Sequence, residues 1–138
     1  MTTPPVQGTL EAALYVDDLD LAEKFYHDVI GLTPLGKVGG RHVFFAVGDS
    51  VLLIFNPDAT AVVSARRESL PVPPHGTKGA GHYCFSVRAD DLQAWRAHLQ
   101  DAGIAIEADF RWPNGARSIY VRDPAGNSVE FAEPGLWF

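Results

Sequence analysis

The stretches that decide the fold are LEAALYV, residues 10–16, and GHYCFSV, residues 81–87, because each opens the same series of elements. In each stretch apolar and polar residues alternate, as in a half-buried strand. An amphipathic helical stretch follows each one, at residues 18–31 after the first and 90–103 after the second. Strand-like runs then end each series. Val16 and Val87 are 71 residues apart, as are Glu11 and His82, so equivalent residues of the two series are separated by a constant distance along the chain. The sequence therefore predicts an α+β domain built from two similar modules.

The predicted modules fit in one domain that spans residues 1–138, which is long enough to bury a core. We expect the first module at about 8–57, a connector at 58–80 and the second module at about 81–134. The run 57–68 is interpreted as a short helix. The rest of the connector is rich in proline and glycine and is expected to be irregular, as a mobile link or lid.

Composition excludes several classes of partner. The net charge of −6 argues against nucleic acid or an anionic membrane surface. No apolar run approaches the roughly 20 residues of a membrane span, and the first residues carry no signal-peptide pattern. Cys84 is the single cysteine, so no intrachain disulfide can form. This favours a reducing compartment, and we expect a cytoplasmic protein.

Local signals set the bounds of the predicted elements. Asp18 is a good N-cap for the first helix, and Gly31 is placed to end it. Residues 104–110 alternate as a half-buried strand. The segments 116–122 and 128–133 are interpreted as a hairpin around a proline- and glycine-containing turn.

Three residues are candidates for one shared site. Glu11 opens the first strand of one module and His82 opens the equivalent strand of the other. Glu130 lies between two apolar neighbours, so alternation turns it to the opposite face from them. Each residue alone is more often a surface charge or an ordinary histidine. If the modules form one curved sheet, however, Glu11 and His82 face each other, and a divalent cation would compensate the buried carboxylates.

The stretches YVDDLDLAEKFYHDVIGL (15–32), GHYCFSV and YVRDPAGNSVEF (120–131) resemble the vicinal oxygen chelate superfamily, the glyoxalase/bleomycin-resistance/dioxygenase fold. The resemblance implies two βαβββ modules that form an open, barrel-like mixed sheet around a divalent metal ion. It also implies metal ligands on the first and last strands of each module.

Carried onto this chain, the family's ligand positions are Glu11, His82 and Glu130, with Leu52 as the fourth, or Leu53 if the register shifts by one. Leucine cannot bind metal, so the resemblance implies a three-ligand site with open positions. Two carboxylates and one imidazole suit Mn²⁺, Fe²⁺, Zn²⁺ or Ni²⁺.

The resemblance implies a metal-dependent enzyme that chelates neighbouring oxygens of a small-molecule substrate, as a lyase or isomerase or as a dioxygenase. Glu11 could double as general base. A homodimer is expected, because open sheet edges need cover. Residues on the strand faces that carry the ligands are expected to line the substrate site: Tyr15, His42, Phe44, Ser118 and Tyr120.

Other members of the family match less well. A glyoxalase I needs the missing fourth ligand, and a fosfomycin thiol transferase has threonine where this chain has Ala13. The main alternative is a metal-free drug-binding protein of the bleomycin-resistance type, with Trp112, Trp137, Phe138 and the connector building the cleft. A scaffold without any ligand is a third reading, but it leaves Glu130 unexplained.

Overall fold

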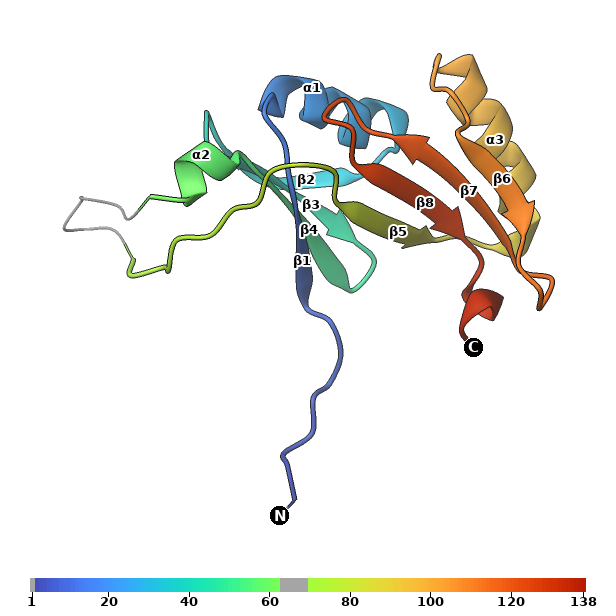
Figure 1. Ribbon diagram of the computed structural model, residues 1–138, viewed down its shortest axis with the longest axis horizontal. Helices are drawn as coiled ribbons and strands as arrows, with labels where there is room; N and C mark the ends of the chain where they lie inside the picture. Colours follow the sequence, from blue (N-terminus) through green and yellow to red (C-terminus); the bar gives the residue numbers. More distant parts are fainter. Residues whose placement is uncertain (1, 63–69) are drawn as a thin grey trace.

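Two separate four-stranded sheets form the framework of the computed structural model, which describes residues 2–62 and 70–138 (Figure 1). The first sheet has the order β1-β4-β3-β2 and the second β5-β8-β7-β6. In each, the outer pair formed by the module's first and last strands is parallel and the other pairs are antiparallel. The strands are β1 Glu11–Tyr15, β2 Thr33–Val38, β3 His42–Val47, β4 Ser50–Phe55, β5 His82–Ser86, β6 Ala108–Arg111, β7 Arg117–Arg122 and β8 Ser128–Ala132.

This arrangement confirms the predicted α+β fold with two repeated modules. The sheets do not join into one curved sheet, and the described residues form no closed barrel. In Figure 1 the helix that follows β1 lies above the first sheet and the helix that follows β5 lies beside the second, whereas the short helix of the connector lies at the far end of the first.

The helices begin and end near the predicted residues. Helix α1 (Leu19–Glu23) continues as a π-helical segment, Lys24–Val29, and Asp18 caps its start by accepting a hydrogen bond from the Leu21 amide at 3.1 Å. Gly31 follows with a φ of 84°, a conformation that favours glycine. Helix α3 (Leu92–Asp101) occupies the equivalent place in the second module.

The connector contains one short helix in its described part. Helix α2 (Pro57–Thr60) confirms the first turn of the helix expected at 57–68, whereas residues 63–68 of that stretch lie outside the described residues. Among the described helices, none has the length and apolar character needed to cross a membrane.

The hydrophobic core lies between the helices and the covered faces of both sheets. In the first helical stretch, Ala22, Phe25 and Tyr26 are buried there and Val29 packs against them partly buried. Alternation sends every second strand residue into the same core, as with Phe45 in β3 and Phe131 in β8. The remaining strand residues therefore point to the open faces of the sheets.

Two strands and one register differ from expectation. Strand β2 has no alternating pattern, because all six of its residues are exposed and a register shift interrupts it between Pro34 and Gly36. Strand β6 is shorter than predicted and begins only at Ala108. The Cα pairings Ala13–Leu53 and Cys84–Glu130 are equivalent, so the counterpart of Glu130 is Leu53 and not Leu52. Leu52 is buried in the core instead.

A buried polar network joins the two modules. Asp123, in the β7–β8 turn, accepts hydrogen bonds from the Tyr26 hydroxyl at 2.8 Å and from the Asn127 side-chain amide at 3.0 Å. The same amide donates to the Tyr15 carbonyl at 3.1 Å, while its oxygen accepts from the Gly81 amide at 2.7 Å. Burial and the Asp123 carboxylate raise the pKa of Tyr26, so its hydroxyl stays a donor. The network ties the end of β1 to the start of β5.

An ion-pair cluster fixes β6 against β7 and α3. Arg117 donates to both carboxylate oxygens of Asp109, at 2.8 and 2.7 Å, and Arg96 of α3 binds the same carboxylate. The Arg117 and Arg96 guanidinium groups lower the pKa of Asp109 to about 2. The carboxylate is therefore stabilised in its charged form.

We predict that Asn127→Ala lowers the free energy of unfolding by about 3 kcal/mol, because it leaves several buried partners without a hydrogen bond. Urea unfolding followed by circular dichroism measures the change. Asn114→Ala is the matched control, since that side chain is exposed in a loop, and should cost less than about 1 kcal/mol. Equal losses in the two variants would contradict a special role for the network.

Asp109→Asn should lower the free energy of unfolding by about 2 kcal/mol near neutral pH. The carboxyl pKa is lower in the folded chain than in the unfolded chain, where it is about 3.9. Its stabilising contribution is therefore complete above about pH 4 and is lost as the pH falls toward about 2. Chemical unfolding of both proteins between pH 7 and pH 2.5 tests this. A difference that stays constant over the range would refute it.

Candidate functional site

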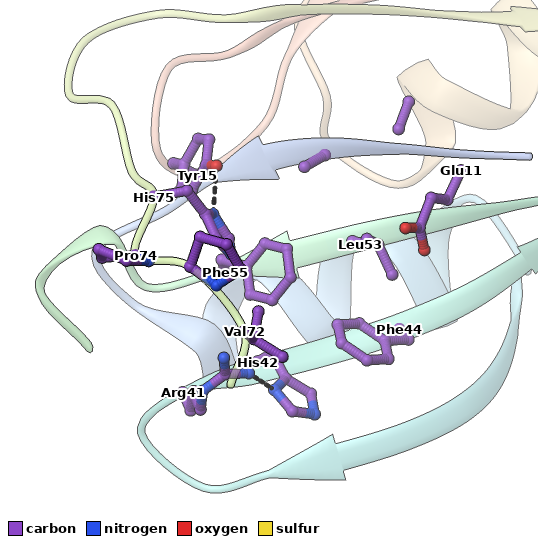
Figure 2. A pocket seen from close by; sticks show the side chains of 13 residues that line it. Glu11, Tyr15, Arg41, His42, Phe44, Leu53, Phe55, Val72, Pro74 and His75 are labelled. Carbon is purple, nitrogen blue, oxygen red and sulfur yellow. Dashed lines mark hydrogen bonds between the residues drawn. The ribbon is translucent and has the colours of Figure 1, made fainter. Parts of the chain in front are cut away.

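Two hollows open on the uncovered sheet faces, one in each module. The first-module hollow has a volume of about 630 Å³ and lies between the first sheet and residues 72–75 of the connector (Figure 2). The side chains that characterise it come from β1, β3, β4 and the segments beside them: Glu11, Tyr15, Arg41, His42, Phe44, Leu53, Phe55, Val72, Pro74 and His75.

The second-module hollow has a volume of about 550 Å³ and lies on the second sheet. Strands β5, β7 and β8 form its floor, and the loop after β6 and the C-terminal turn form its walls. Its lining residues are His82, Cys84, Trp112, Pro113, Asn114, Tyr120, Glu130, Leu136 and Trp137.

His82 and Glu130 meet at the floor of the second-module hollow. The parallel pairing of β5 with β8 brings them together, and alternation turns Glu130 away from the core that holds Val129 and Phe131. The His82 Nε2 atom lies 3.2 Å from Glu130 Oε1. The Glu130 side chain is 5 % exposed and that of His82 52 %, so a buried carboxylate meets an accessible imidazole.

A chain of hydrogen bonds fixes the orientation of Glu130. The Trp112 indole N–H donates to Ser118 Oγ at 2.8 Å, and the Ser118 hydroxyl donates to Glu130 Oε2 at 2.5 Å. An indole N–H can only donate, so the single hydroxyl proton of Ser118 is left for the carboxylate. Glu130 Oε1 is thereby directed toward His82.

The tautomer of His82 follows from its second contact. Its Nδ1 atom lies 3.1 Å from the Ser128 carbonyl oxygen, which can only accept, so Nδ1 carries the proton. In the neutral ring Nε2 then presents a lone pair to a carboxylate oxygen. Two acceptors facing each other at 3.2 Å repel unless a proton or another cation lies between them. Either a proton on Nε2, which makes the contact an ion pair, or a bound cation satisfies this arrangement.

Two neighbouring residues are poor proton donors at neutral pH. Partial burial and the Glu130 carboxylate raise the pKa of the Cys84 thiol to about 12. The same two causes raise the pKa of Tyr120 to about 12. Tyr120 also stacks near the His82 ring, with the ring centres 6.1 Å apart. Both groups remain protonated beside the carboxylate.

Glu11 lies in the first-module hollow, apart from the other two candidate ligands. It is the exposed first residue of β1. Across the described residues, no group of three histidine, cysteine, aspartate or glutamate side chains could hold a metal ion. One chain thus brings together His82 and Glu130 and presents Glu11 separately.

The residues expected to contact substrate divide between the two hollows. Tyr15, His42 and Phe44 line the first, and Tyr120 lines the second. Ser118 is fully buried, and its hydroxyl is committed to Trp112 and Glu130.

Sequence reasoning missed several lining residues, among them Phe55, Arg41 and Cys84. Phe55 shares the face of Leu53, so alternation along β4 could have found it. Arg41 precedes its strand and carried no signal. Cys84 was considered only for disulfides, although it shares the face of His82. Trp112 and Trp137 line the second-module hollow as the drug-binding alternative expects, but Phe138 is fully exposed.

Known proteins resemble this chain over most of its length. A solved structure of lactoylglutathione lyase from Agrobacterium tumefaciens is 44% identical, with a TM-score of 0.92, and the match covers 97% of this chain and 98% of that one. Glutathione transferase FosA from Serratia marcescens is 27% identical over 125 residues, which is 91% of this chain and 79% of the relative.

A third relative is longer than this chain. Catechol-2,3-dioxygenase from Bacillus subtilis (strain 168) is 30% identical over 120 residues, which cover 86% of this chain and 39% of the relative. The model of the Glyoxalase/Bleomycin resistance protein/Dioxygenase superfamily matches residues 8–131. Fold, repeat and sequence agree, and the chain belongs to this superfamily.

Proposed function

We propose that this protein is a divalent-metal-dependent enzyme that binds two neighbouring oxygens of a small substrate, as a lyase or isomerase or as a dioxygenase. The observation that carries the proposal is the facing pair of acceptors, His82 Nε2 and Glu130 Oε1. We assign the protein to the cytoplasm and to a homodimer.

The two facing atoms fit a shared metal ion. Ligand atoms at about 2.1 Å from one cation lie about 3.0 to 3.4 Å apart at angles of about 90 to 109°. The observed separation of 3.2 Å falls inside that range. Hydrogen bonds from Ser118 to Glu130 and from His82 to the Ser128 carbonyl hold both donors in place, as the partners of metal ligands commonly do.

We propose Glu11 of a second copy as the third ligand. Within one chain the three donors lie in different hollows, and both hollows are open. A twofold arrangement that stacks the first-module hollow of one copy on the second-module hollow of another would join them, and would do so twice. Large apolar side chains such as Phe110 and Trp137 are exposed and would gain cover.

The chain's own groups have distinct tasks in this proposal. A bound metal ion would act as a Lewis acid toward the substrate oxygens. Glu11 is exposed and is the candidate general base, which would take a proton from the substrate on a carboxylate oxygen that has left the metal. Trp112 and Ser118 keep Glu130 oriented.

His82→Ala and Glu130→Gln should each weaken binding of Mn²⁺, Zn²⁺ or Ni²⁺ more than about tenfold, because each removes one donor of the shared pair. Isothermal titration of chelator-treated protein measures the affinity. Asp58→Asn, on an exposed residue of α2, is the control and should leave it unchanged. The proposal would be overturned if wild-type protein bound none of these three ions and also failed to bind Fe²⁺ under anaerobic conditions.

Mixing variants tests whether the site is shared between copies. Glu11→Gln and His82→Ala proteins should each bind metal weakly. After unfolding and refolding together, about a quarter of all sites should bind metal tightly, since half of the dimers are mixed and each holds one intact site. If all three ligands came from one chain, no tight site would return. Analytical ultracentrifugation checks that dimers form.

The drug-binding alternative keeps one supporting observation, the pair Trp112 and Trp137 on the second-module hollow. It predicts that a cationic glycopeptide changes the tryptophan fluorescence of metal-free protein in a saturable way. A flat titration would remove this alternative.

A further inference from the structure

The aromatic rings of the first-module hollow form a corner of two walls (Figure 2). His42 and Phe44 stack in parallel, with centres 4.0 Å apart and planes 6° apart. Phe55 stands nearly perpendicular to both, at 79° and 77°. A flat ring that stacks on one wall meets the other wall edge-on. Stacked and edge-to-face contacts are the two arrangements that aromatic pairs prefer. The corner is thus shaped for a planar aromatic group.

One end of this hollow offers hydrogen-bond donors and a positive charge. Arg41 Nη1 lies 2.7 Å from His42 Nδ1, and a guanidinium can only donate, so His42 carries its proton on Nε2. Burial and the Arg41 charge lower the pKa of His42, which keeps the ring neutral. Among the described residues, no carboxylate lies within ion-pair distance of Arg41. An anionic oxygen group is the natural complement.

The other polar groups of the hollow are already engaged or carry the opposite charge. The Tyr15 hydroxyl and His75 Nδ1 bond to each other at 2.7 Å, and the His75 amide donates to the Thr60 carbonyl at 2.9 Å. Glu11 lies across the hollow from Arg41, with Phe44 and Leu53 between them (Figure 2). An anion is therefore attracted to the Arg41 end and repelled from the Glu11 end.

We propose that the first-module hollow binds an aromatic carboxylate. Its ring lies in the corner of Phe44 and Phe55, and its carboxylate binds Arg41 and the His42 N–H. The volume of about 630 Å³ is within the range of small-molecule sites. The identification of this acid as the substrate rests on the proposed function: its reacting oxygens then lie toward Glu11, at the end opposite the carboxylate.

The test is an NMR titration of metal-free protein with 2-naphthoate, followed on the histidine ring signals. We expect saturable shifts of His42 and His75. Arg41→Gln should weaken binding at least tenfold, Arg41→Lys should restore part of it, and the exposed Arg88→Gln control should bind like wild type. Equal affinity in Arg41→Gln and wild type would overturn the proposal.

Three further ligands separate charge from ring shape. Naphthalene-2-methanol, which lacks the charge, should bind at least tenfold more weakly than 2-naphthoate. Cyclohexanecarboxylate should bind several-fold more weakly than benzoate, and equal affinity of these two acids would refute the aromatic corner.

The proposed function fails separately from this one. His82→Ala should lose metal and still bind 2-naphthoate with wild-type affinity. If wild-type protein binds no metal yet binds 2-naphthoate through Arg41, the ligand site stands and the metal enzyme falls. If metal binds and 2-naphthoate does not, the metal-dependent function stands and the proposed carboxylate site is refuted.

Discussion

The hydrogen-bonded carboxylate of Asp123 is the constraint on which the arrangement of the two modules depends. It accepts from the backbone of its own turn, from the Asn127 side chain and from Tyr26 in the helix of the other module. A buried carboxylate is costly without such partners, so the turn can be buried only where the first module supplies its donor. Because Asn127 also holds the end of β1 and the residue before β5, the network sets how the two sheets lie relative to each other. The position of the two hollows relative to each other follows from that placement.

Much of the fold follows from patterns that are local in the sequence. The repeat, the helix cap at Asp18 and the turn around Asp123 depend on neighbouring residues, so they could be predicted. Strand β2 could not, because its residues are all exposed and its pairing is interrupted beside Pro34, which removes the alternation that marks a strand. The separation of the two sheets could not be predicted either. Alternation shows on which face of its strand a residue lies, but it does not show which strands or sheets lie opposite that face.

The candidate site shows the same division. Alternation placed Glu130 on the open face. The repeat, however, set His82 opposite Glu11, and the pairing of β5 with β8 that brings His82 beside Glu130 was not predicted. Spacing alone could not fix the register of β4 to within one residue. In the structure Leu53, and not Leu52, occupies the position in the first module that is equivalent to Glu130 in the second. The role of Ser118 depends on Trp112 reaching back over the sheet from a loop, a contact that no periodic pattern encodes. Glu11 remains a predicted ligand, because within one chain it lies in the other hollow.

The distribution of donors over two hollows has a thermodynamic consequence. If a metal ion takes two ligands from one chain and the third from another, metal binding and association are linked equilibria. Each ion then adds to the affinity between copies, and each association step raises the affinity for the ion. Dilution would release metal from a protein whose ligands are all intact, and metal depletion would dissociate a dimer whose apolar contacts are all intact. The occupancy of the site would therefore report the concentration of the protein as well as that of the metal.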